Sequence, residues 1–211
     1  TADLADEAIR NLTDHHATTP DSPWFMLLAP GACHAPHQAP TELIDRYTAE
    51  FERGWDRERE IRLARQIELG VVPAGTELPA RNRGVSAWDD HSDDERRLFS
   101  RLAGAYAAML HHFDEHLGRV IASLDATGQL DDTIVLVLSD NGASQEGGPL
   151  GFVNAMAPFN MVAETLDDKL ARLDDIGGPD THSNFPHGFA MAANTPLRMY
   201  KQNTHSSGIR D

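Results

Sequence analysis

Apolar positions recur at helical spacing in several stretches of the chain. In residues 4–12 they fall three or four positions apart, and residues 41–69 are charged and mostly helical in pattern. The longest such pattern begins at Ser92, which forms a capping-box signature with Glu95, and continues to Gly128. These stretches predict helices, and the one that begins at Ser92 is predicted to be the longest.

Two short apolar runs have the length and composition of buried strands. They are residues 24–29, Trp-Phe-Met-Leu-Leu-Ala, and residues 133–138, Thr-Ile-Val-Leu-Val-Leu, and turn-forming residues bound both. A further helix is predicted over residues 162–176, closed by two glycines. Helices alternating with strands predict an α/β fold with a largely parallel central sheet between helices. In such sheets ligands bind beyond the carboxyl ends of the strands, so the loops after the two runs are the places to seek chemistry.

Composition and charge exclude several classes of protein. The chain is 40% hydrophobic and 24% charged, as in an ordinary globular domain. Its 18 Lys and Arg against 33 Asp and Glu give a net charge of −15, which argues against a nucleic-acid partner. The longest apolar stretch is broken by Pro30 and is far shorter than the roughly 20 residues of a membrane span, so no membrane partner is expected. The first residue, Thr1, is no initiator Met; we expect an internal part of a longer protein, with cytoplasm and periplasm both open.

Asp140 and Asn141 form the first candidate site, on the loop that leaves the second apolar run. A carboxylate and an amide carbonyl side by side suit a hard cation such as Ca²⁺ or Mg²⁺ better than zinc. Two ligands leave most of a calcium shell of about six to eight oxygens to be supplied from elsewhere. The alternative is a hydrogen-bonded turn, because Asp-Asn-Gly is common turn chemistry.

His34, His37 and Lys201 form the second set of candidates. The two histidines lie in a proline-stiffened loop after the first run, and His34, the nearer to it, could donate a proton to a substrate oxygen. Lys201 is one of only two lysines and could bind an anionic oxygen. The alternatives are solvated loop histidines and an ordinary surface lysine.

Two further motifs have competing interpretations. Cys33 stands beside His34, but adjacent side chains in an extended loop point apart, so we interpret it as a packing residue. His112, Glu115 and His116 match the inverted zinc-protease pattern H-x-x-E-H and place both histidines on one helical face. A third ligand is not evident, and the polar margin of an amphipathic helix explains the pattern equally well.

Three segments occur in an order that closely resembles the bacterial arylsulfatases. They are residues 29–40, Ala-Pro-Gly-Ala-Cys-His-Ala-Pro-His-Gln-Ala-Pro, residues 138–142, Leu-Ser-Asp-Asn-Gly, and residues 194–201, Asn-Thr-Pro-Leu-Arg-Met-Tyr-Lys. The resemblance runs over nearly the whole chain and points to the formylglycine-dependent sulfatases of the alkaline-phosphatase-like superfamily. It implies that residues 1–211 are the middle part of a single catalytic domain of alkaline-phosphatase-like α/β fold. The nucleophile-bearing N-terminal part and the C-terminal part would lie outside this chain.

The resemblance also implies roles for individual residues. Asp140 and Asn141 would form half of a calcium site, with Mg²⁺ as the other possible ion. His34 would contact the sulfate ester near its leaving oxygen, and Lys201 would bind a sulfate oxygen, with His205 as a weaker substrate-binding candidate. Residues 206–208 read Ser-Ser-Gly where many relatives have Glu-Gly-Gly or a similar turn.

The nucleophile implied by the resemblance is a formylglycine made from the Cys or Ser of a C/S-x-P-x-R motif upstream of this chain. Cys33 does not fit that motif, because neither the proline nor the arginine follows it at the required place. The implied activity of the complete enzyme is hydrolysis of small-molecule sulfate esters, with a formylglycine-generating enzyme as partner and an inactive isolated chain. The alternatives are a phosphonate monoester or phosphodiester hydrolase of the same superfamily, and a non-catalytic metal-binding remnant.

Overall fold

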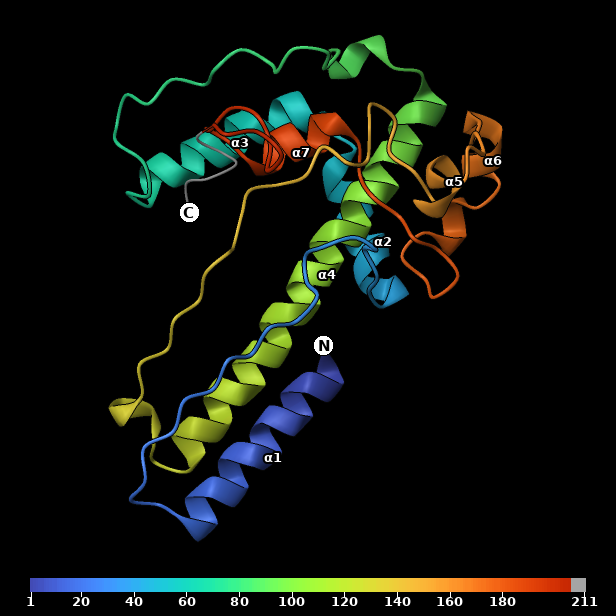
Figure 1. The fold of residues 1–211 in the computed structure, drawn as a ribbon. Coiled ribbons are helices and arrows are strands. Elements are labelled where there is room, and N and C mark those ends of the chain that lie inside the picture. The colour runs from blue at the N-terminus through green and yellow to red at the C-terminus, as the bar shows by residue number, and fades with distance from the viewer. Residues whose placement is uncertain (206–211) are drawn as a thin grey trace.

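One long helix is the central element of the fold. The computed structural model describes residues 1–205. The Ser-Ser-Gly sequence at residues 206–208, which differs from the turn of many relatives, lies outside the described residues. Helix α4 (Asp93–Ala126) has 34 residues and crosses the whole fold (Figure 1). The Ser92 hydroxyl accepts from the backbone N–H of Glu95 at 3.2 Å, and the Glu95 carboxylate accepts from the backbone N–H of Ser92 at 2.9 Å. The predicted capping box and the predicted longest helix are both confirmed.

Helix α1 (Ala2–Thr18) lies along the C-terminal half of α4 (Figure 1). Its apolar positions face α4 and form a small apolar cluster, the lower cluster, whose buried members are Ala5, Ala8, Leu12, Val120 and Leu124. Trp24, Met26 and Leu28 pack against this cluster from the extended segment that follows α1. The helix predicted from residues 4–12 is therefore present and longer at both ends.

The larger apolar cluster, the upper cluster, surrounds the N-terminal half of α4. Helices α2 (Thr41–Phe51), α3 (Gly54–Glu68) and α7 (His187–Ala193) contribute to it, and α3 lies beside α7 (Figure 1). Trp55 lies at the centre of this cluster, is 1% exposed and packs against the rings of Trp88, Phe99 and Phe189. Helix α7 can approach the Trp55 ring closely because Gly188 has no side chain; a Cβ there would lie 2.3 Å from that ring.

The remaining helical segments are short: η1 (Trp88–Asp90), η2 (Leu130–Asp132), α5 (Met156–Phe159), α6 (Leu166–Leu170) and η3 (Leu173–Asp175). The single helix predicted over residues 162–176 is wrong, since the structure has α6 and η3 there. The Glu164 carboxylate accepts from the backbone N–H groups of Val153 and Asn154, at 3.2 and 2.9 Å, and lies outside the helix for that reason. Within residues 1–205 no helix combines the length and the apolar character that crossing a membrane requires.

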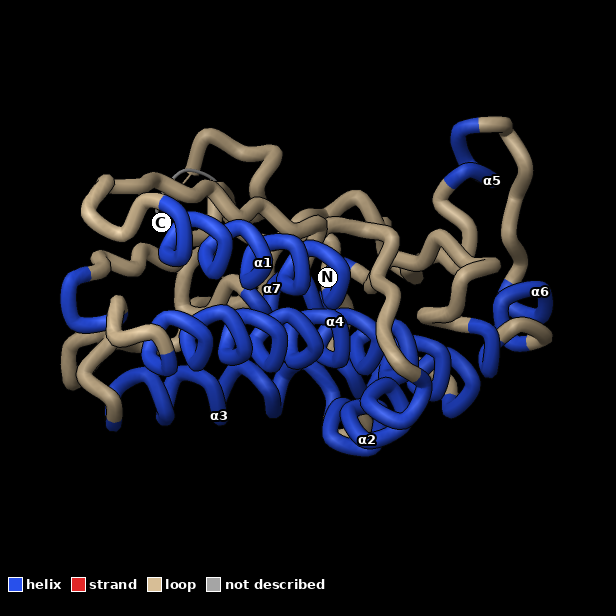
Figure 2. Tube along the Cα trace, turned by 90° about the horizontal axis from the view of Figure 1, so that it is seen from below, coloured by secondary structure: helices blue, strands red, loops and turns tan. Residues whose placement is uncertain are grey.

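The predicted central sheet is not confirmed by the part of the chain that is described. Residues 24–29 and 133–138 are extended but belong to no strand, and Figure 2 shows helices and loops alone. Two isolated bridges, Phe152 to Asn184 and Asn154 to His182, are the nearest approach to a sheet in residues 1–205. A strand needs a neighbour to pair its N–H and C=O groups, and neither apolar run has one here.

The two apolar runs nevertheless start beside each other and extend in the same direction. The Trp24 indole N–H donates to the side-chain carbonyl of Gln129 at 3.4 Å, which places the start of the first run beside the turn that precedes the second. Both runs then extend from that end of α4 toward the other (Figure 1). Their outward faces are bare, with Phe25 90% exposed and Ile134 88% exposed.

Candidate functional site

The loops that follow the two apolar runs meet at Lys201. The Lys201 ammonium lies 3.4 Å from Nε2 of His34, although 167 positions separate the two residues in the chain. The backbone N–H of Lys201 donates to the carbonyl of Ala143, at 3.1 Å, in the loop after the second run. The structure thus brings together two of the predicted site residues from distant parts of the sequence.

The orientation of the His34 ring follows from its second nitrogen. Nδ1 lies 2.7 Å from the carbonyl oxygen of Ala35, which can only accept, so Nδ1 carries the proton in the neutral ring. Nε2 then presents its lone pair to the Lys201 ammonium, and it presents an N–H to the site once the ring is protonated. The ring is exposed, which leaves this nitrogen accessible to a substrate.

Glu146 is the acidic neighbour of the Lys201 ammonium and is not among the residues predicted from the sequence. Its carboxylate lies 3.7 Å from the Lys201 ammonium, whose side chain is 19% exposed against 53% for Glu146. The segment before it is anchored to the residue after Lys201, because Gln202 donates to the Ser144 hydroxyl at 2.7 Å and accepts from the backbone N–H of Gln145 at 3.2 Å. No local sequence signal marks Glu146, since its contact depends on the long-range approach of two loops.

Asn194 joins the loop after the second run to the loop that carries Lys201. Its side-chain oxygen accepts from the backbone N–H of Ala143 at 2.7 Å, and its amide N–H₂ donates to the carbonyls of Ala143 and Met199, at 3.3 and 3.0 Å. Asn194 is 8% exposed, so these bonds form away from water. It belongs to a segment that supports the family resemblance, but its bridging role was missed.

Met199 adopts a left-handed backbone conformation, with φ of 74°. An L-residue with a β-carbon disfavours this region, so its surroundings must hold it there. The side-chain carbonyl of Asn82 accepts from the Met199 N–H at 3.3 Å, and Asn194 binds its carbonyl. Asn82, which is 4% exposed, therefore supplies a buried support for the Lys201 loop.

Asp140 and Asn141 lie at the start of the loop that ends at Glu146. Asp140 is exposed, and the Ser139 hydroxyl donates to the backbone carbonyl of Asn141 at 2.8 Å. Their donor chemistry fits a hard cation, because a carboxylate and an amide carbonyl both offer oxygen atoms. Within residues 1–205 there is no group of three or more His, Cys, Asp or Glu side chains suited to hold a metal, so these two residues would supply only part of a shell.

His37 and Cys33 have structural surroundings instead. His37 is 2% exposed and stacks on Phe185, and burial lowers its pKa to about 3, so the ring is neutral at physiological pH. Burial also raises the pKa of the Cys33 thiol, which disfavours the thiolate that a nucleophile needs. His205, the weaker substrate-binding candidate, lies with Nδ1 3.2 Å from the carbonyl of Arg198 and remains a prediction.

His112 and His116 converge as their spacing predicts, with 3.1 Å between the two Nε2 atoms. The third ligand of a zinc site is absent among residues 1–205. The Arg119 guanidinium instead donates to Nδ1 of His116 at 2.9 Å, which places a positive charge beside the pair. These contacts support the margin of an amphipathic helix over a zinc-protease centre.

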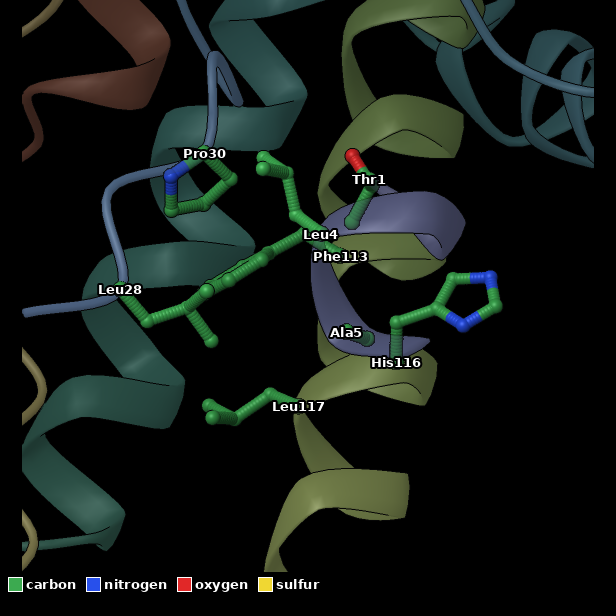
Figure 3. Close-up of a pocket in the computed structure, with 8 residues that line it drawn as sticks. All are labelled: Thr1, Leu4, Ala5, Leu28, Pro30, Phe113, His116 and Leu117. Atoms are coloured by element: carbon green, nitrogen blue, oxygen red, sulfur yellow. The ribbon is translucent and has the colours of Figure 1, made fainter. Parts of the chain in front are cut away.

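A small cavity lies between α1, α4 and the end of the first run. It has a volume of about 10 Å³, the size of about one water molecule. Figure 3 shows the apolar side chains of Leu4, Leu28 and Leu117 around it, with the His116 ring turned to one side. This cavity cannot hold a substrate, so the candidate functional site remains the one at His34 and Lys201.

This arrangement places a lysine ammonium beside a histidine ring in the loops that follow two apolar extended runs. The sulfatase family model matches residues 1–211, and the chain belongs to the sulfatase family.

The chain is 32% identical over 188 residues to an uncharacterized sulfatase of Schizosaccharomyces pombe, which covers 89% of this chain and 33% of that protein. It is 28% identical over 192 residues to an arylsulfatase of Klebsiella aerogenes, which covers 91% of this chain and 39% of that protein. A choline-sulfatase of Rhizobium meliloti matches 76 residues at 33% identity, covering 36% of this chain and 15% of that protein. The matched stretches thus span between about a third and two fifths of the length of the first two relatives.

Proposed function

We propose that the complete protein hydrolyses sulfate monoesters of small molecules, with aryl sulfates as the substrate class. The observation that supports this proposal best is the 3.4 Å approach of Lys201 to His34. Membership of the sulfatase family and the similarity to an arylsulfatase support the same reaction. A cation for the sulfate oxygens and a proton donor for the leaving oxygen are two of the groups that favour cleavage of a sulfate ester.

Lys201 binds a sulfate oxygen and neutralises part of its negative charge. The imidazolium form of His34 donates its Nε2 proton to the leaving oxygen and becomes the neutral ring, whose Nδ1–H stays directed to the carbonyl of Ala35. The hydrogen bonds of Asn194 and Asn82 hold the Lys201 loop in position before the substrate arrives. This preorganisation avoids moving the cation during the reaction.

Asp140 and Asn141 are the residues of this chain that would hold Ca²⁺, or Mg²⁺ in its place. When bound, the ion supplies positive charge that neutralises sulfate oxygens. The remaining oxygen ligands would come from outside residues 1–211, as would the formylglycine nucleophile in a C/S-x-P-x-R motif. A formylglycine-generating enzyme would then be the partner that prepares the active protein, and the isolated chain is expected to be inactive.

The two apolar runs are proposed to be neighbouring strands of a largely parallel sheet of the alkaline-phosphatase-like fold. They start together at Trp24 and Gln129, and their following loops meet at Lys201. Residues 133–138 are mostly exposed although they are apolar on both faces, as expected of a central strand that still lacks its neighbours. Hydrogen exchange in the complete protein would test this, because paired strands protect their amides from exchange.

The test of the function compares variants of the complete protein on 4-nitrophenyl sulfate and phenyl sulfate. Lys201→Ala is expected to raise KM at least about tenfold, because it removes the cation that binds the sulfate. His34→Ala is expected to lower kcat by about a hundredfold, and more for phenyl sulfate, because its leaving group depends more on the donated proton. Arg57→Ala, which changes an exposed cation on α3, is the matched control.

The outcomes separate the possible functions. Equal losses for both leaving groups in His34→Ala would contradict the role of His34 as proton donor. Faster turnover of a phosphodiester or a phosphonate monoester than of any sulfate ester would favour the other hydrolase class. An absence of calcium binding in calorimetry, together with full activity of Asp140→Ala, would contradict the metal site; a complete protein without any hydrolase activity would be the metal-binding remnant.

A further inference from the structure

Glu146 places a negative charge beside the only lysine of the candidate site. Its carboxylate is 3.7 Å from the Lys201 ammonium, on the same atom that would bind a substrate oxygen. An oxygen bound to that ammonium lies about 2.8 Å from it, so it lies at most about 6.5 Å from the Glu146 carboxylate. This separation is shorter than the Debye length of about 8 Å at physiological ionic strength, so salt does not fully screen the repulsion.

The position of Glu146 is set by the surrounding backbone. Its N–H donates to the Ser144 hydroxyl at 3.0 Å, and Gln202 holds that hydroxyl in turn. The next residue, Gly147, is buried, and a Cβ there would lie 1.8 Å from the carbonyl oxygen of Phe185. The turn that carries Glu146 therefore packs closely against the backbone of Phe185 at Gly147, and Ser144 of the same turn is hydrogen-bonded to Gln202. These contacts fix the backbone from which the Glu146 carboxylate reaches Lys201.

We infer that Glu146 is a specificity-determining residue that makes the site select singly charged esters over doubly charged ones. The inference rests on the proposed function and narrows its substrate class. A sulfate monoester has one negative charge, whereas a phosphate monoester has nearly two at neutral pH. Since Coulomb repulsion is proportional to charge, the carboxylate weakens binding of the dianion by the square of the factor by which it weakens binding of the monoanion.

The size of the effect follows from the same distance. Repulsion between unit charges 6.5 Å apart in bulk water corresponds to a factor of about three in affinity. The expected penalty is therefore about threefold for a sulfate monoester and about ninefold for a phosphate monoester. Both factors increase if the site is less polar than bulk water, but the dianion is still affected by the square of the monoanion factor.

The experiment measures the affinity of the complete protein for phenyl sulfate and phenyl phosphate at pH 8 and low salt. Competitive inhibition and calorimetry are both used, so that binding is measured even without turnover. Glu146→Gln is expected to tighten phenyl sulfate about threefold and phenyl phosphate about ninefold. Glu146→Asp retains the charge and is expected to keep the preference of the parent protein. Asp167→Asn, which removes an exposed carboxylate on α6, is expected to change neither affinity.

Equal factors for the two ligands in Glu146→Gln, or no change in either, would overturn the inference, and so would a failure of the parent protein to bind either ligand. Failure of the proposed function is a separate result. If the parent protein hydrolyses no sulfate ester, the function proposed above is wrong, while the ratio of the two binding constants still tests the role of Glu146. Thermal unfolding verifies that Glu146→Gln is folded, as expected for a half-exposed side chain.

Discussion

Replacement of Asn194 by alanine tests whether this side chain holds the candidate site together. The amide makes three hydrogen bonds, one to the N–H of Ala143 and two to the carbonyls of Ala143 and Met199. A hydrogen bond contributes about 1 kcal/mol net, and a buried donor left without a partner costs about 1–3 kcal/mol more. Because Asn194 is 8% exposed, Asn194→Ala is expected to lower the free energy of unfolding by about 3 kcal/mol.

Two measurements on the complete protein separate stability from positioning. Urea unfolding gives the change in free energy, and the KM for 4-nitrophenyl sulfate reports on Lys201, whose backbone N–H shares the Ala143 carbonyl with Asn194. The matched control is Asn160→Ala, since Asn160 is exposed and its amide donates to the nearby carbonyl of Met156. It is expected to cost less than about 1 kcal/mol and to leave KM unchanged.

Asn194→Asp makes the test sharper. It keeps the acceptor for Ala143 but replaces the donor by a second acceptor that faces two carbonyl oxygens. At neutral pH this variant is expected to be at least as unstable as Asn194→Ala. A loss below about 1 kcal/mol in both variants, with KM unchanged, would refute the reasoning that Asn194 links the two loops.

Three further predictions concern the surroundings of the site and the start of α4. Burial lowers the pKa of His37 from 6.5 to about 3, so on acidification the unfolded chain binds the proton before the folded chain does. The contribution of neutral His37 to the free energy of unfolding is therefore complete above pH 6.5. It falls as the pH drops from 6.5 toward 3, by up to about 1.4 kcal/mol per pH unit. His37→Leu should flatten that part of the stability curve measured by urea unfolding, and parallel curves would contradict the assignment. Ser92→Ala should lower the unfolding free energy by about 1 kcal/mol through loss of the cap, and an unchanged urea midpoint would exclude the capping role. Gly147→Ala should destabilise by more than about 2 kcal/mol because its Cβ would overlap the carbonyl of Phe185, and wild-type thermal stability would show that this close approach is wrong.

The helices were predictable where the signal was local. The capping box at Ser92 and the apolar spacing after it locate α4, and the same spacing locates α1. Residues 162–176 were mispredicted because Glu164 binds backbone N–H groups ten and eleven positions earlier. A second capping box, formed by Thr165 and Asp168, marks the true start of α6 and was a usable signal.

The candidate site was predictable only in part. The rule that ligands bind beyond the ends of parallel strands selects the loops of His34 and Asp140. Lys201 was a candidate as one of only two lysines, and the family resemblance implies its role. The roles of Asn194 and Glu146 depend on how two distant loops meet, which no local pattern encodes. The apolar runs are extended as expected, but pairing is a property of neighbouring chain segments and cannot be derived from one strand alone.

The length of α4 has a consequence for how the molecule responds to mutation. At 1.5 Å per residue its 34 residues span about 51 Å, with the upper cluster at one end and the lower cluster at the other. The two clusters have no member in common. Substitutions in Leu12 and Trp55 should therefore change the unfolding free energy additively, as independent sites do. Although α4 joins the two apolar clusters, we therefore expect each to respond to mutation as a separate core.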